Sequence, residues 1–160
     1  MPVSRLLLAL AACGLAGAAP AATPLGTSFQ RLAHGRVTRT SLPFDARRVA
    51  IYYGASWCGP CRAFVPELIA AYPALRARGI EVLLVSDDAT CAAALDYART
   101  SRMPWLLLPC DPQRRLPLRL LGGKALPGIV VVDRNGTVVA TSWSADRSSK
   151  PHSMLEGMLR

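Results

Sequence analysis

Two cysteines separated by two residues, Cys58 and Cys61, carry the strongest chemical signal in the sequence. An apolar run rich in β-branched and aromatic residues, 49–53, precedes them and predicts a buried strand; apolar residues at helical spacing follow them. Cys58 is therefore expected where a strand ends and a helix begins. The unpaired N–H groups and the positive dipole end of a helix start stabilise a thiolate, which lowers the pKa of Cys58 and makes it a nucleophile near neutral pH.

Cys61 follows one helical turn later on the same face, so it can close a disulfide with Cys58. Such a short loop removes little entropy from the unfolded chain, which favours a reversible two-electron switch over a structural staple. Pro60 falls early in the helix, where its missing N–H is not needed. The alternative is half of a zinc site, but zinc needs two more ligands, usually a second close pair, and the remaining cysteines and histidines are isolated. We expect neither a metal nor another cofactor.

The segment Trp57-Cys58-Gly59-Pro60-Cys61 resembles the active-site motif of the thioredoxin superfamily. The longer stretch 56–68 and the segment Met103-Pro104-Trp105 look like the tryparedoxin/nucleoredoxin branch, and exported TlpA-like thioredoxins share the same layout. The likeness covers residues 29–145. It implies a thiol–disulfide oxidoreductase in which Cys58 attacks a substrate disulfide and Cys61 resolves the mixed disulfide.

The resemblance also implies residues that bind the substrate. Trp57 is expected as a half-exposed aromatic surface, with Gly59 and Pro60 beside it. Pro127 corresponds to a cis-proline that faces the cysteines, and X–Pro is the only peptide bond for which the cis form costs little. Because proline donates no hydrogen bond, the backbone of Leu126 is left to pair with an extended substrate segment.

The sequence departs from the thioredoxin pattern in two places. The residue after the proline, usually threonine, is Gly128, which leaves room beside the substrate groove. A buried aspartate that thioredoxin-like reductants carry six residues before the first cysteine is Tyr52 here, and tyrosine is a poor base at neutral pH. Glu67 is a candidate proton acceptor for Cys61, although its position also predicts a solvated side chain. Trp143 fits either a substrate surface or the core.

The composition excludes some partners. The 160 residues carry a net charge of +9, from 19 Lys and Arg against 10 Asp and Glu. These charges are scattered along the chain, and nucleic-acid binding would need a basic cluster with interleaved aromatic residues. We therefore expect no nucleic-acid partner.

Residues 1–22 are predicted to be a signal peptide. Arg5 supplies a positive start, and the apolar run 6–19 that follows is too short to cross a bilayer comfortably. Leu10-Ala11-Ala12-Cys13 also resembles a lipobox, in which Cys13 would be lipidated and anchor the protein. The short apolar run before Cys13 favours ordinary cleavage. Both interpretations place the mature protein outside the bacterial cytoplasm, in the periplasm.

A linker, 23–28, and one domain, 29–160, are expected after the signal peptide. The predicted strands are 36–40, 49–53, 80–85, 105–108, 129–133 and 137–143, and the predicted helices are 58–78, 91–99 and 148–160. This order predicts an α/β protein of thioredoxin fold, with a mixed central sheet, helices on both faces and a helix–strand insertion around residues 88–110.

Cys91 and Cys110 form a candidate structural disulfide. If strands 80–85 and 105–108 are parallel neighbours, as a right-handed connection predicts, both cysteines lie at the same end of the sheet. Neighbouring strands are about 4.8 Å apart, and a disulfide spans roughly 4.4–6.8 Å between Cα atoms. Two unrelated buried thiols are the alternative, and the sequence leaves both open.

Taken together, the residues predict an exported, monomeric thiol–disulfide oxidoreductase that acts on protein thiols and disulfides and is supplied by a membrane-bound electron donor. The Gly-Pro between the cysteines resembles reducing members of the superfamily. The alternative is a thioredoxin-fold copper-binding or metallochaperone module. Such modules typically have Cys-x-x-x-Cys and a nearby histidine, whereas this sequence has the shorter spacing and no histidine between His34 and His152.

Overall fold

The computed structural model describes residues 25–26, 28–110 and 117–160 of the chain. The predicted signal peptide 1–22, with Cys13, lies outside these residues. Leu25, inside the predicted linker 23–28, is buried against the sheet. Buried contacts with the domain therefore begin before Phe29.

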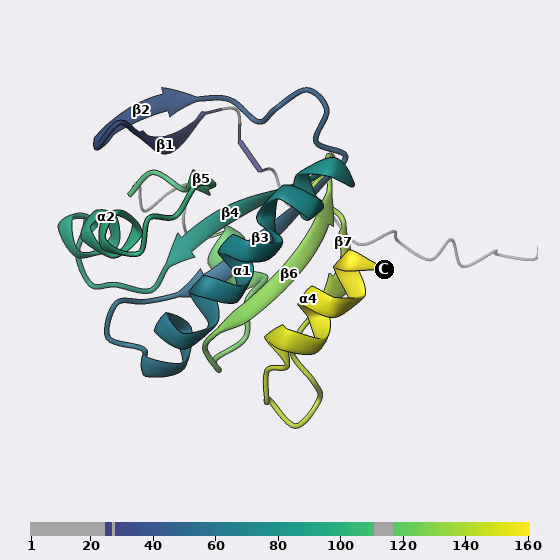
Figure 1. The fold of residues 1–160 in the computed structure, drawn as a ribbon. Helices are drawn as coiled ribbons and strands as arrows, with labels where there is room; N and C mark the ends of the chain where they lie inside the picture. The colour runs from purple at the N-terminus through teal and green to yellow at the C-terminus, as the bar shows by residue number, and fades with distance from the viewer. Residues whose placement is uncertain (1–24, 27, 111–116) are drawn as a thin grey trace, which may run out of the picture.

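A seven-stranded mixed sheet forms the centre of the protein, in the order β2-β1-β5-β4-β3-β6-β7 (Figure 1). Its strands are β1 Phe29–Ala33, β2 Arg36–Thr40, β3 Arg48–Gly54, β4 Ile80–Ser86, β5 Leu106–Leu107, β6 Gly128–Asp133 and β7 Val138–Thr141. The strand before the cysteine motif, β3, lies in the middle; it pairs with β4 in parallel and with β6 antiparallel. This arrangement confirms the predicted thioredoxin fold.

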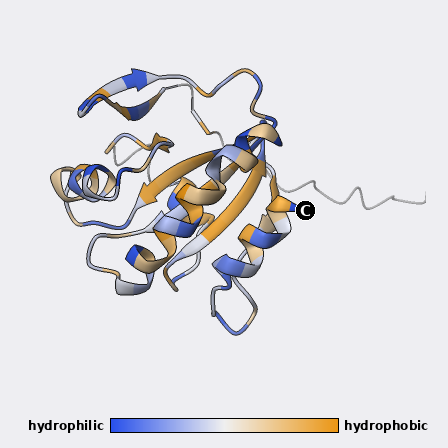
Figure 2. Ribbon diagram, viewed as in Figure 1, coloured by the Kyte–Doolittle hydropathy of each residue, from blue (hydrophilic) through white to orange (hydrophobic). Residues whose placement is uncertain are grey.

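The central strands are apolar on both faces because both faces are covered. Along β3, Ala50 and Tyr52 belong to one buried cluster and Val49, Ile51 and Tyr53 to the other, as the two-residue alternation of a strand requires. Figure 2 shows the same pattern, with the middle strands hydrophobic and the β1–β2 hairpin largely hydrophilic.

Three helices pack on the face that contains Tyr52: α1 Gly59–Ala77, α2 Cys91–Thr100 and α4 Pro151–Leu159. The helical residues 117–120 cover the other face through the buried Leu118. The first helix ends as predicted, because Gly79 adopts a positive φ of 71° that closes the C-terminus. No helix among the described residues has the length and apolarity that a membrane span requires.

Some predicted elements differ from those observed. The region before Thr40 holds a two-stranded hairpin rather than one strand, since β1 pairs with both β2 and β5. The predicted strand 105–108 is shorter in the structure, where it contains only Leu106–Leu107; Trp105, just before it, is fully buried.

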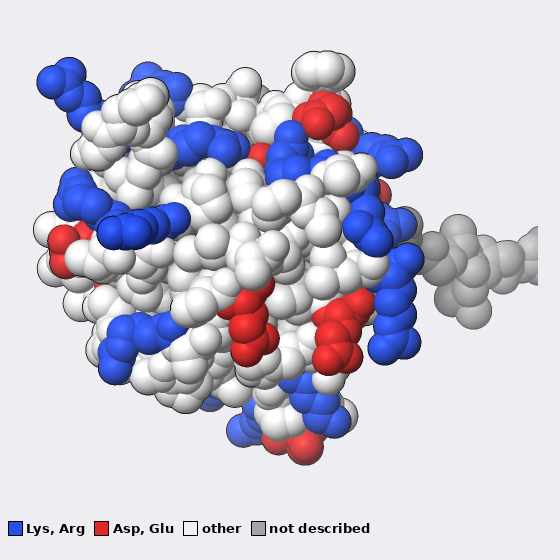
Figure 3. All heavy atoms as spheres, in the orientation of Figure 1, with Lys and Arg blue, Asp and Glu red and all other residues white. Residues whose placement is uncertain are grey.

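The surface charge is scattered, as the sequence suggests. Figure 3 shows basic side chains spread over the visible face and mixed with acidic ones, not gathered in one block.

A buried carboxylate, Glu81, ties the amino end of β4 to its neighbours. It accepts hydrogen bonds from Tyr72 Oη at 2.6 Å, Arg31 Nη2 at 3.0 Å and the backbone N–H of Val82 at 2.9 Å, and Arg76 Nε lies 3.6 Å away. Burial, together with the hydrogen bond to Glu81, raises the pKa of Tyr72 to about 12, so its hydroxyl remains a donor. A buried charge is tolerated only when it is paired in this way.

Glu81→Ala should therefore lower the free energy of unfolding by about 3–5 kcal/mol, because it leaves two guanidinium groups without their shared partner. Urea denaturation measures the loss. The control is Glu156→Ala, which removes an exposed carboxylate 4.0 Å from Arg160 and should change little. Equal effects of the two substitutions would show that the buried network does not stabilise the fold.

Candidate active site

Cys58 lies at the junction that the sequence predicts, between the end of β3 and the start of α1. It is the N-cap residue of α1, with an extended backbone, and its Sγ accepts a hydrogen bond from the backbone N–H of Cys61 at 3.1 Å. The two sulfur atoms form a disulfide with a Cα–Cα distance of 5.2 Å. The structure therefore shows the oxidised form of the pair.

The two cysteines differ in their access to solvent. Cys58 is 6% exposed and Cys61 is 0% exposed. Beside them, Trp57 is 63% exposed, and Gly59 and Pro60 are also on the surface. Cys58 is thus the less buried of the two cysteines, and it lies between exposed residues.

Asp88 holds the turn that leads into Cys58. Its buried carboxylate accepts hydrogen bonds from the backbone N–H and the hydroxyl of Ser56, the latter at 2.6 Å, and from Ser86 Oγ at 2.7 Å. From the other side of the turn, Arg62 Nη1 donates to the carbonyl oxygen of Ser56 at 2.6 Å. The sequence predicts that Asp87 and Asp88 begin the capping region of the next helix, 91–99.

That prediction is wrong for Asp88, because Thr90 is the N-cap residue of α2 and its Oγ1 accepts from Ala93 N at 3.1 Å. Asp88 lies beyond the carboxyl end of β4, which is the neighbour of β3 in the sheet. An acidic residue directly after the strand next to β3 was the one sequence signal that could have connected Asp88 with the turn before Cys58.

Tyr52, at the position of the aspartate in thioredoxin-like reductants, is completely buried. Its hydroxyl donates to the carbonyl oxygen of Cys61 at 3.4 Å and lies 3.0 Å from Tyr97 Oη. Burial, with a smaller effect of Tyr97, raises the pKa of Tyr52 far above its usual value, so the hydroxyl stays protonated. Glu67 is on the surface, where Oε2 contacts His152 Nδ1 at 2.9 Å.

The peptide bond between Leu126 and Pro127 is cis, as the resemblance implies. Leu126 packs against the small apolar cluster formed by Ala55, Cys58 and Cys61, and Pro127 is buried. The predicted site residues from the two parts of the sequence therefore meet at one place on the surface.

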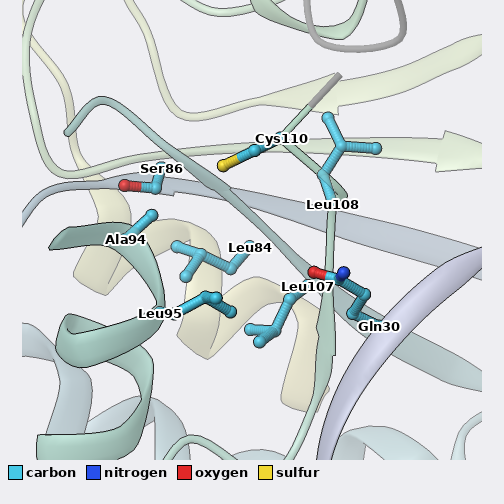
Figure 4. Close-up of a pocket in the computed structure, with 8 residues that line it drawn as sticks. All are labelled: Gln30, Leu84, Ser86, Ala94, Leu95, Leu107, Leu108 and Cys110. Carbon is cyan, nitrogen blue, oxygen red and sulfur yellow. The ribbon is translucent and has the colours of Figure 1, made fainter. Parts of the chain in front are cut away.

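The other two cysteines are neighbours but are not bonded to each other. Strands β4 and β5 are parallel, as predicted, with Leu83 opposite Leu106. The sulfur of Cys91, the first residue of α2, lies 3.8 Å from the carbonyl oxygen of Cys110. Figure 4 shows the Cys110 sulfur directed towards Ser86, above a small apolar pocket. The structure thus places the two residues at one end of the sheet, and the bond between them stays a prediction.

Within residues 25–26, 28–110 and 117–160, no three side chains of His, Cys, Asp or Glu come together in a way that could hold a metal ion.

Comparison with known proteins agrees with this geometry. The family model described as thioredoxin-like matches residues 46–138. Tryparedoxin from Trypanosoma brucei brucei is 33% identical over 132 residues, which cover 80% of this chain and 85% of that protein. Probable nucleoredoxin 1 from Arabidopsis thaliana is 36% identical over 110 residues, or 62% of this chain. The matches span only 19% to 29% of the length of the nucleoredoxins from Arabidopsis thaliana, Xenopus laevis and Danio rerio.

Solved structures show the same fold. Tryparedoxin II from C. fasciculata superimposes with a TM-score of 0.64 at 30% identity, covering 84% of this chain and 88% of that one. The chain belongs to the thioredoxin-like family, and its Cys58 and Cys61 are bonded to each other at the start of α1.

Asp88→Ala should lower the free energy of unfolding by about 2–3 kcal/mol, because charge-assisted hydrogen bonds to two serines are lost in a buried place. Chemical denaturation of the oxidised protein measures this. The matched control is Asp96→Ala, which removes an exposed carboxylate from α2 that lies 3.8 Å from Arg99. If both variants unfold at the same denaturant concentration, Asp88 does not hold the turn.

The Cys91–Cys110 bond can be tested by mapping disulfides after treatment with oxidised glutathione. Trypsin cleavage after Lys and Arg places Cys91 in peptide 79–99, Cys110 in peptide 103–114 and the redox pair in peptide 49–62. We expect a cross-linked product of the first two peptides, absent from Cys91→Ser. Separate alkylated forms of both peptides, in a sample whose 49–62 peptide is fully oxidised, would exclude the bond.

Proposed function

We propose that this protein is an exported oxidoreductase that reduces disulfides in proteins and in small thiol compounds. The observation that carries the proposal is the bonded pair at the N-terminus of α1, in which Cys58 keeps a small exposed fraction of 6% and Cys61 is fully buried. This arrangement gives one attacking thiol and one resolving thiol.

The reaction starts from the reduced pair. The Cys58 thiolate is stabilised by the N–H of Cys61 and by the positive end of α1. It attacks one sulfur of the substrate disulfide, and the other substrate sulfur leaves as a thiolate that takes up a proton. The Cys61 thiol then loses its proton and attacks Cys58 Sγ, which releases the second substrate thiol. Two electrons and two protons pass to the substrate, and the pair becomes the disulfide seen here.

The loop around the cis-proline supports substrate binding. Leu126 packs against the cluster of Ala55, Cys58 and Cys61, and we assign to its backbone the hydrogen bonds with an extended substrate segment. Trp57, directly before Cys58, offers an exposed aromatic surface, and Gly59 and Pro60 are exposed after it.

The substrate class and the location follow from different observations. A tryparedoxin II structure contains glutathionylspermidine, which supports a small thiol compound as well as a protein at this kind of site. The reducing direction is supported by the Gly-Pro pair, and it requires an external dithiol donor, for which a membrane-bound protein is the proposed source.

Export is supported by the sequence of residues 1–22. Cell fractionation and N-terminal sequencing of the mature chain test it; an intact Met1 on cytoplasmic protein would refute it.

Cys61→Ser should accumulate mixed disulfides with its substrates, because Cys58 still attacks but nothing resolves the product. Cys58→Ser should form none and should not reduce insulin disulfides. Non-reducing electrophoresis and an insulin precipitation assay measure both outcomes. Retained insulin reduction by Cys58→Ser would overturn the proposed mechanism.

A further inference from the structure

The indole ring of Trp143 fills space that two glycines leave open. A Cβ atom built on Gly128 would stand 2.0 Å from the ring atom Cζ2, and one built on Gly123 would stand 2.4 Å from Cδ1. Neither distance is compatible with a side chain at these positions unless the ring moves. The room that the sequence leaves beside Gly128 is therefore occupied by Trp143.

The indole ring of Trp143 also forms a hydrogen bond with the loop 118–128 that it covers. Trp143 Nε1 donates to the carbonyl oxygen of Ala125 at 2.9 Å, and the ring meets Tyr53 edge-on with 5.2 Å between centroids. Tyr53 Oη in turn donates to the carbonyl oxygen of Leu118 at 2.6 Å, and Gly122 lies directly against the tyrosine ring. Burial raises the pKa of Tyr53 well above its usual value, so this hydroxyl remains a donor. Two aromatic rings thus hold residues 118–128.

The loop that they hold carries the substrate-facing backbone. Leu126 packs against the cluster that contains both cysteines, and the cis bond to Pro127 follows it. The preceding Gly123 and Lys124 are exposed, and glycine has more backbone freedom than any other residue. The ring therefore restricts a segment whose own sequence would leave it adaptable.

We propose that Trp143 is a positioning residue of the oxidoreductase, which fixes the backbone of Leu126 in the place where an extended substrate pairs with it. This inference rests on the proposed function. Trp143 acts through the loop, so its loss changes how a large substrate binds and leaves the reactivity of Cys58, which the start of α1 determines, unchanged.

Trp143→Ala should raise KM for a disulfide-bonded protein substrate about tenfold with a much smaller change in kcat, because the pairing backbone is no longer preorganised. The rate at which iodoacetamide alkylates the reduced Cys58 should stay within about twofold, because this small reagent does not use the loop. Trp143→Phe keeps a ring in the same space and should show a smaller rise in KM. The control is Phe44→Ala, which removes a 94% exposed aromatic ring and should leave KM unchanged.

A second test adds a side chain at residue 128, alone and together with the loss of the ring at residue 143. Gly128→Thr should raise KM as Trp143→Ala does, because the new side chain displaces the indole. The double variant should stay within about threefold of Trp143→Ala, because the space is then already empty and the two effects do not multiply. Should Gly128→Thr fail to fold, Gly128→Ala tests the same contact.

Two results would overturn the inference: a wild-type KM in both Gly128 variants, or a loss of alkylation rate in Trp143→Ala as large as the rise in KM. Failure of the proposed function is a separate result, in which the wild-type protein reduces no disulfide. The contact is then judged by hydrogen exchange of the Trp143 indole N–H in NMR. Protection in the wild type that is lost in Gly128→Ala supports the contact, and equal exchange in both refutes it.

Discussion

The structure depends on a single turn, in which the central strand β3 passes into α1 over residues 55–58. An N-cap residue normally uses a side-chain oxygen to accept a backbone hydrogen bond from the first helical turn, and here the sulfur of Cys58 does so. The atom that caps the helix is also the atom that bonds to a substrate in the proposed mechanism. The turn therefore needs a second anchor that does not take part in the chemistry, and the buried carboxylate of Asp88 supplies it through Ser56.

The buried ionisable groups are distributed unevenly around this turn. Glu81 lies at the amino end of β4, among two arginines and Tyr72, whereas the cysteines lie beyond the carboxyl end of β3. Beneath Cys61, the position of a carboxylate in thioredoxin-like reductants is taken by two hydroxyl groups, those of Tyr52 and Tyr97. Burial raises the pKa of both tyrosines, so both hydroxyl groups stay protonated.

Local sequence patterns predict part of the fold and part of the candidate site. The β-branched run before Cys58 and the helical spacing after it determine the junction within some twenty residues, and the resemblance supplied the cis-proline. The missed features depend on contacts between distant residues. Asp88 reaches Ser56 across 32 positions, and Trp143 fills the space beside Gly128 from the segment after β7. The first strand, β1, was missed because it contains polar residues, one of which, Arg31, is used by the buried Glu81.

The two edges of the sheet have different chemistry. The outer strand β2 carries Arg36 and Arg39, and like charges on an edge discourage the addition of a further strand. The opposite outer strand, β7, has the sequence Val-Val-Ala-Thr with its two valines exposed. Its own side chains carry no charge, and the nearest arginines, which line a pocket with Val139 and Ala140, come from other elements. Where copies of this domain are crowded together, we therefore expect strand addition at β7 rather than at the opposite edge, where the strand itself carries arginines.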